Sequence, residues 1–187
     1  MDMESPPNEK KFLYHTVPEN MRGTELLSLS ELETAHPDLF VSYMEKYKTR
    51  PHVPKQFIEY LNAHWNEVVM LSPVSPDEIK KELVLAGYNP RELLFYKIDV
   101  DEHPELFDPT KTAICLFDYD EEGNIKSKEY RAFQKEDIDA YSSIPKETIS
   151  SYVTKIKNEE KPLMFLGIPH VLHKGKIDIS NAPVITA

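Results

Sequence analysis

The sequence predicts an α+β fold, with a mixed central sheet and flanking short helices. Two segments carry this prediction. Residues 67–100 have the pattern of a strand, a helix and a second strand, which make a β-α-β unit if the two strands run parallel. Residues 112–133 have the pattern of a hairpin. Over the whole chain, fifteen prolines and only five glycines divide the sequence, so we expect short elements.

The chain is expected to begin with a flexible tail, because residues 1–10 are polar and contain prolines. Residues 11–187 have the length of a single globular domain, which should bury a core without a disulfide or a structural metal. The first strand is predicted at residues 12–17, which are aromatic and β-branched and end at Pro18. A turn at residues 20–24 follows.

The next segment is predicted to be one broken helix or two short ones. Ser30 and Glu33 have the spacing of a capping box, and Pro37 suits the first turn of a helix. Several apolar side chains then share one helical face, namely Leu39, Phe40, Tyr43, Met44 and Tyr47. Residues 49–66 have helical spacing but lie between prolines and a strand-like run, so either helix or strand fits them.

The strand–helix–strand unit has clear boundary signals. Its first strand is apolar and covers residues 68–71. Ser75 suits the N-cap of the helix, with Glu78 as the acid of a capping box, and Gly87 suits the C-terminal stop. The second strand is expected at residues 93–99. The helix between the two strands should cover one face of the sheet.

The hairpin is predicted from strands at residues 112–119 and 125–133, joined by a loop whose Gly-Asn pair suits a bulge. The second of these strands is polar on one side, as an edge strand would be. Residues 135–161 predict two short helices split at residues 142–145, and residues 163–179 return to strand character.

The composition excludes several classes of protein. With 22 basic and 32 acidic side chains the net charge is −10, and only four residues are arginine, so general nucleic-acid binding is not expected. Cys115 is the single cysteine, which rules out an intrachain disulfide and a cysteine-based zinc site. No stretch has the roughly 20 apolar residues of a membrane span, and there is no apolar signal-peptide region. These features favour a cytoplasmic protein, while secretion into a host cell by a route that ignores signal peptides stays open.

Most of the seven histidines have an ordinary structural explanation. His170 and His173 are three residues apart in a predicted strand and point to opposite faces, so they make a poor metal-chelating pair. No metal is therefore expected. His64 fits a partly buried structural pair with the tryptophan beside it, and His36 fits the start of a helix.

His15 and Ser72 are the stronger candidates for a functional site. His15 follows Tyr14 in the first predicted strand and precedes a turn with Arg22, so its imidazole could project into a cleft. A histidine that is only hydrogen-bonded at the rim of the sheet is the alternative. Ser72 follows the first strand of the β-α-β unit, and the carboxyl ends of parallel strands gather ligand-binding groups. The segment lacks the glycines of a phosphate loop or nucleophile elbow, so a serine hydrolase is not expected. Cys115 lies in an apolar strand and is predicted to be an inert thiol.

Several segments also follow a familiar order. Leu-Tyr-His at residues 13–15 opens the fold, and Val-Val-Met-Leu-Ser-Pro at 68–73 leads into the helix at 76–87 and the strand at 95–99. This order resembles the ADP-ribosyltransferase-like group, with RNA 2′-phosphotransferases and bacterial DNA-modifying ADP-ribosyltransferases as the nearest likenesses. The run at residues 169–177 is similar to the late strand that carries the catalytic glutamate of that group. The pattern extends over most of the chain.

The resemblance implies NAD or another nucleotide as the cofactor. The strand-borne histidine of the group, which contacts the nicotinamide-side ribose of NAD, corresponds to His15. The serine or tyrosine of its second strand region corresponds to Ser72. Tyr14 and Arg22 would complete the cofactor site, with the arginine next to a phosphate.

This chain departs from the group at one position, because His170 stands where the late strand should present glutamate. An imidazole cannot act as the anion that stabilises an oxocarbenium charge. The departure leaves three readings: transferase activity is altered or lost, another acid such as Glu67 or Asp178 substitutes, or the site serves different chemistry.

Two functions are consistent with these observations. The first is an NAD- or nucleotide-binding protein of the ADP-ribosyltransferase-like kind, with His15, Ser72 and His170 as its candidate catalytic residues. The second is a non-catalytic interaction or regulatory module, such as a bacterial effector, whose acidic surface engages a basic partner. A small-molecule nucleotide is the expected partner in the first case and a basic protein surface in the second.

Overall fold

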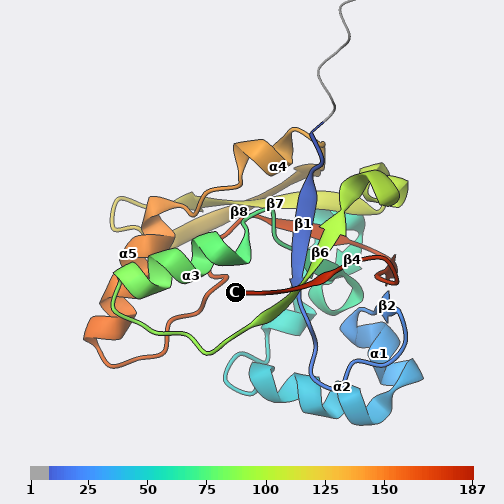
Figure 1. Ribbon diagram of the computed structural model, residues 1–187, viewed down its shortest axis with the longest axis horizontal. Helices are drawn as coiled ribbons and strands as arrows, with labels where there is room; N and C mark the ends of the chain where they lie inside the picture. The colour runs from blue at the N-terminus through green and yellow to red at the C-terminus, as the bar shows by residue number, and fades with distance from the viewer. Residues whose placement is uncertain (1–8) are drawn as a thin grey trace, which may run out of the picture.

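The computed structural model describes residues 9–187, so the tail predicted for residues 1–10 lies almost entirely outside it. Small sheets form the centre of the molecule, and short helices pack around them (Figure 1). The predicted α+β class is therefore confirmed.

Two sheets make up the centre, and they are joined at a single point. The first has the order β1 (Phe12–Thr16), β6 (Leu94–Asp99), β11 (Val184–Thr186). The second has the order β5 (Val69–Leu71), β9 (His170–His173), β7 (Thr112–Tyr119), β8 (Ile125–Ala132). The junction is an antiparallel bridge in which the Tyr14 N–H donates to Ser72 O at 2.9 Å and the Ser72 N–H donates to Tyr14 O at 2.8 Å.

The strand–helix–strand unit is present, but its sheet differs from the mixed sheet that the sequence predicts. β5 and β6 point the same way, yet β1 lies between them, and every strand pair is antiparallel. The reason is a long-range one. Leu13 of β1 is fully buried, and β1 finds hydrogen-bonding partners on both edges only between those two strands.

The helix of this unit, α3 (Pro76–Leu85), begins after Ser75 and ends before Gly87 as predicted, but within the described residues the Glu78 side chain does not return the capping-box bond to the Ser75 N–H. The Ser75 side chain accepts a hydrogen bond from the Glu78 N–H. At the other end Gly87 has φ +96°, its N–H bonds Val84 O at 3.0 Å, and the Tyr88 N–H bonds Leu83 O at 2.9 Å. These two bonds define a Schellman motif, which requires the left-handed conformation that glycine adopts without strain.

The segment near Pro37 forms two short helices, α1 (Leu29–Ala35) and α2 (Pro37–Met44). The predicted cap is wrong by two residues. Ser28, not Ser30, caps α1, and it forms the reciprocal capping box with Glu31. The pairs Ser28/Glu31 and Ser30/Glu33 have the same spacing, and burial of Ser28 decides between them.

The ambiguous residues 49–66 form neither a long helix nor a long strand. They fold into a short hairpin of β3 (Phe57–Ile58) and β4 (Ala63–His64), whose turn contains Asn62 at φ +45°. The 3₁₀ helix η3 (Glu59–Leu61) connects the two strands, and three more precede or follow the hairpin, namely η1 (Glu45–Tyr47), η2 (Val53–Lys55) and η4 (Trp65–Glu67).

Most of the remaining elements agree with the prediction, but the start of the predicted strand region at residues 163–179 is wrong. Residues 164–167 form a turn, in which the Leu166 N–H bonds Leu163 O at 3.1 Å, and strand structure begins only at His170. β7 and β8 form the hairpin, with a register shift at Asp118/Tyr119, and α4 (Asp137–Ala140) and α5 (Lys146–Lys157) are the two helices split as expected. Four short elements remain, η5 (Val100–Glu102), η6 (Pro104–Phe107) and the paired strands β2 (Glu25–Leu26) and β10 (Ile177–Asp178). Within residues 9–187, none of the helices is both long and apolar enough to cross a bilayer.

The core lies on both faces of the four-stranded sheet. On one face Ile114 and Val171 join the cluster that also contains Leu13. On the other face Cys115 and Leu172 pack beneath the segment from η2 to η4. A third cluster lies beneath α3 and α5. Alternate residues of β7 and β9 therefore belong to different clusters, as the twofold period of a strand requires.

Candidate functional site

The three segments that carry the candidate residues are neighbours in space. The backbone bridge joins Tyr14 to Ser72, and β5 pairs with β9 through Leu71 and Val171. One further step of that register places Ser72 opposite His170. The backbones of strand ends that are far apart in the sequence thus meet at one place, to which we refer as the strand junction.

At the strand junction, His15 is bonded to the protein itself. Its Nδ1–H donates to the carbonyl oxygen of Met70 at 2.7 Å, which fixes the proton on Nδ1. The residue as a whole keeps some solvent contact, but the ring is enclosed, and this desolvation lowers the pKa of His15 to about 4. His15 is consequently a neutral imidazole at neutral pH.

His170 is held in a similar way in more apolar surroundings. Its Nδ1–H donates to the carbonyl of Ile168. The rings of Trp65, Phe117 and Phe165 surround it with centroids 6.5, 6.2 and 6.3 Å away. Desolvation lowers the pKa of His170 to about 4. The position that the resemblance assigns to a catalytic anion therefore holds a neutral ring among aromatic ones.

The Ser72 hydroxyl is also used internally. Ser72 is buried, and its Oγ donates to Val74 O at 3.0 Å and accepts from the Val74 N–H at 3.1 Å. These bonds close the turn from β5 into α3. The hydroxyl has no neighbouring imidazole as a hydrogen-bond partner, so nothing here would activate it as a nucleophile.

Tyr14 and Arg22 do not share a site. Tyr14 lines a solvent-open hollow of about 190 Å³, together with Ser75 at the start of α3 and Ser142. Arg22 lies elsewhere on the surface, where its guanidinium grips both oxygens of Asp38 at 3.1 and 2.5 Å. The arginine predicted to meet a phosphate is thus paired with a carboxylate.

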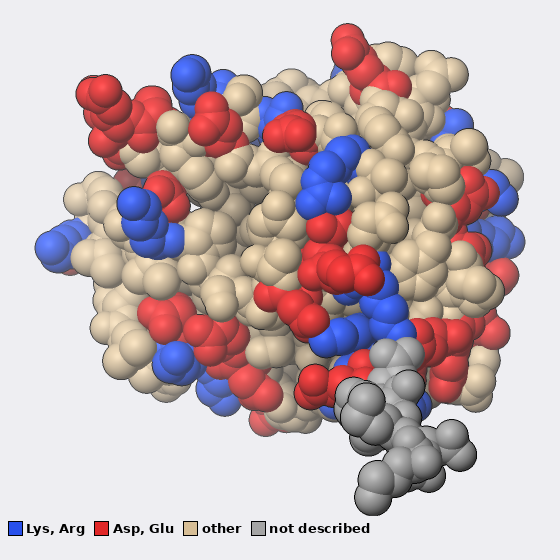
Figure 2. All heavy atoms as spheres, turned by 90° about the horizontal axis from the view of Figure 1, so that it is seen from above, with Lys and Arg blue, Asp and Glu red and all other residues tan. Residues whose placement is uncertain are grey.

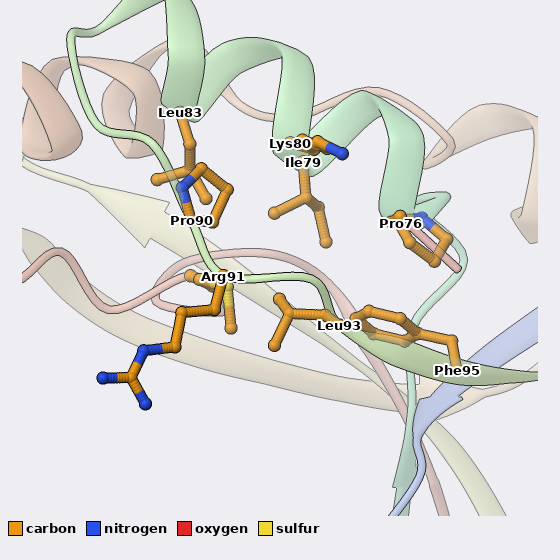
Figure 3. A pocket seen from close by; sticks show the side chains of 10 residues that line it. Pro76, Ile79, Lys80, Leu83, Pro90, Arg91, Leu93 and Phe95 are labelled. Carbon is orange, nitrogen blue, oxygen red and sulfur yellow. The ribbon is translucent and has the colours of Figure 1, made fainter. Parts of the chain in front are cut away.

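A second hollow lies between α3 and the chain that leads into β6. Ile79 and Leu83 of α3 point toward Pro90 and Leu93 across it (Figure 3). It holds only about 10 Å³, the room of one water-sized sphere. Neither this hollow nor the one beside Tyr14 is lined by His15, Ser72 or His170, and both are smaller than the roughly 300 Å³ from which ligand pockets usually begin.

The two acids considered as replacements for glutamate lie outside the strand junction. The Glu67 carboxylate accepts the His64 N–H at 2.6 Å, and this bond lowers the pKa of Glu67. Asp178 is on β10, where it accepts the Ser180 N–H at 2.9 Å. Over residues 9–187, no group of three or more His, Cys, Asp or Glu side chains has the arrangement of a metal site.

Two further groups that the sequence analysis considered, Cys115 and His173, lie on the strands beside the junction. Cys115 is directly opposite His170 on one side and Tyr130 on the other. Burial raises the pKa of the Cys115 thiol to about 11, as the predicted inert thiol requires. His173 lies three residues further along β9 than His170 and is also buried, with its Nδ1 2.8 Å from Thr112 Oγ1. The strand register places Cys115 beside His170 and Tyr130, and His173 beside Thr112, and this register could not be read from the sequence.

Comparisons of this chain with models of protein families, with curated proteins and with solved structures give no match.

Proposed function

We propose that this protein is a non-catalytic interaction module that engages a basic partner through exposed carboxylates. One observation carries the proposal: the imidazoles of His15 and His170 and the hydroxyl of Ser72 all bond to the protein's own backbone. These polar groups stabilise the junction of two sheets, so the function is assigned to the outer surface.

The end of the β7–β8 hairpin supplies the anionic surface. Asp118, Asp120, Glu121 and Glu122 are all exposed, and no salt bridge within the described chain uses any of them. Asp120 accepts the N–H groups of Glu122 and Asn124 at 2.9 and 2.8 Å, so the turn holds the other carboxylates in place.

One face of the molecule carries charges of mixed sign. Figure 2 shows one face of the molecule, on which acidic and basic side chains lie in adjacent small groups rather than as one field. A partner would therefore be guided to a local group of carboxylates, and its binding should weaken as salt is added.

Calorimetry with a lysine decapeptide tests this function. Binding should be lost in the double variant Glu121→Gln, Glu122→Gln, which keeps Asp120 and so keeps the turn. The matched control, Glu33→Gln with Glu136→Gln, removes the same charge from exposed positions elsewhere and should bind as the parent protein does. If both double variants lose peptide binding equally, binding depends only on net charge, and the proposed surface at the hairpin end is refuted.

Nucleotide binding is the second candidate, favoured by the hollow that Tyr14 shares with Ser75 at the start of α3. In this proposal the chain resembles ADP-ribosyltransferases in binding NAD, while transferase chemistry is altered or lost because His170 is neutral and enclosed. A calorimetric titration with NAD should give heat that Tyr14→Ala reduces and that the exposed His52→Ala does not. Absence of heat, or equal heat in all three proteins, would reject nucleotide binding at this place.

A further inference from the structure

The two outer edges of the central sheets are built differently. β8 ends the four-stranded sheet and carries Lys126, Lys128, Glu129 and Arg131, charged side chains of the kind that prevent another strand from adding. β11 ends the other sheet and consists of Val184, Ile185 and Thr186. Only the β8 edge is protected by charge.

The hydrogen-bond register shows which backbone groups of β11 are free. Ala187 and Leu93 exchange both of their bonds, at 3.0 and 3.3 Å, and the Lys97 N–H bonds Pro183 O at 2.9 Å. Pairing in an antiparallel ladder alternates, so Ile185 also faces β6. The N–H and C=O groups of Val184 and Thr186 therefore point away from the sheet, and no strand covers them within residues 9–187.

Both sides of this edge offer contacts for an added strand. Val184 and Leu94 lie on the side turned away from α3, and they are 51% and 44% exposed. The hollow under α3 lies on the opposite side, beside Ala187. Lys80 and Arg91 line that hollow, which has no Asp or Glu in its lining, and Figure 3 shows the Arg91 guanidinium extending away from it. Neither cation takes part in a salt bridge in the part of the chain that the structure describes.

We propose that the β11 edge binds an extended peptide segment of alternating apolar and acidic residues as an additional strand. Its backbone bonds the free groups of Val184 and Thr186, and its apolar side chains pack on Val184 and Leu94. Its carboxylates lie on the other side, toward Lys80 and Arg91, because successive side chains of a strand alternate between faces. This surface is separate from the acidic hairpin end and prefers a partner of the opposite charge. A test of peptide binding at β11 is therefore independent of the basic-partner proposal.

Fluorescence anisotropy of a labelled peptide of about eight residues, alternating valine and glutamate, tests the proposal. Val184→Pro and Thr186→Pro each remove an outward N–H and leave the bonds to β6 intact, so each should weaken binding about tenfold or more. Thr186→Val keeps the N–H and serves as the matched control. Lys80→Gln with Arg91→Gln should weaken binding and reduce its dependence on salt.

If circular dichroism shows that a proline variant is unfolded, a second measurement on the unaltered protein still tests the proposal. A probe that is N-methylated at every backbone amide has no N–H to donate on either edge, and it should fail to bind the unaltered protein. The proposal is overturned by the absence of binding to the parent protein, by proline variants that are folded and bind normally, or by an N-methylated probe that binds equally well. Concentration-dependent dimerisation that Val184→Pro abolishes would instead assign the edge to a second copy of this chain.

Discussion

The strand junction and the β11 edge use their polar groups in opposite ways. At the junction, the side chains of His15, Ser72 and His170 bond inward to backbone carbonyls, and the fold takes up their hydrogen-bonding capacity. At β11 the side chains are ordinary apolar ones, but the backbone of Val184 and Thr186 points outward. The difference teaches that the residue types most typical of catalysis can be structural, while an unremarkable Val-Ile-Thr run offers the free hydrogen-bonding groups.

This contrast predicts that changes at the junction alter stability and that changes at the edge alter binding.

Acid should destabilise the protein strongly between pH 6.5 and pH 4. His15 and His170 are neutral in the folded protein with a pKa of about 4, whereas an unfolded histidine titrates near 6.5. The unfolded state therefore binds more protons as the pH falls, and the free energy of unfolding should drop by about 3 kcal/mol for each of the two residues. Urea unfolding at a series of pH values measures this slope. His15→Gln, whose amide can still donate to Met70 O, should flatten it, and the exposed His52→Gln should not.

Gly167→Ala should destabilise the loop that leads into β9. Gly167 has φ +77°, and an added Cβ would lie 2.4 Å from the Tyr119 hydroxyl and 2.8 Å from Thr148 Oγ1. These hydroxyls donate to the carbonyls of Gly167 and Leu166, so they cannot move without losing those bonds. Gly23→Ala is the control, because Gly23 has φ +72° but open space around it. Chemical denaturation should show Gly167→Ala to be less stable than the control by about 2–4 kcal/mol.

Ser72→Ala should lower the free energy of unfolding by about 1–3 kcal/mol, because the buried N–H of Val74 loses its acceptor. Binding of the lysine peptide and of the valine–glutamate peptide should be unchanged. A variant of normal stability that loses ligand binding would show that Ser72 belongs to a functional site after all.

Gly87→Ala should cost about 1 kcal/mol, since alanine must adopt the left-handed conformation that ends α3. The site has room for the added methyl group, whose nearest contact would be 4.0 Å from Ile156. Unchanged melting would contradict the Schellman motif that orients α3 over the sheet.

Local signals explain which parts of the fold could be predicted. Ser75 and Gly87 mark the ends of α3 through bonds to residues at most five positions away, so the sequence alone locates them. Ser28 competes with Ser30 for the same local role, and only tertiary burial separates the two. The insertion of β1 between β5 and β6 depends on contacts across more than fifty residues, for which no local pattern exists.

The candidate site shows the same limit. The sequence predicts His15, Ser72 and His170 as site residues, and the structure places them on neighbouring strands. No residue pattern shows that backbone carbonyls such as Met70 O accept their hydrogen bonds. The sequence prediction has no strand at residues 184–186. Three consecutive β-branched residues after Pro183 are the signal that could have found β11.

The central claim is that the histidines of the strand junction are neutral structural groups. NMR titration of the ring carbon signals of His15 and His170, with and without NAD, tests it most directly. The account predicts that both rings stay neutral from pH 7 down to about pH 5 and that their signals do not shift when NAD is added. Titration of either ring near pH 6.5, or a shift of its signals with NAD, would contradict the claim and return the junction to the status of an active site.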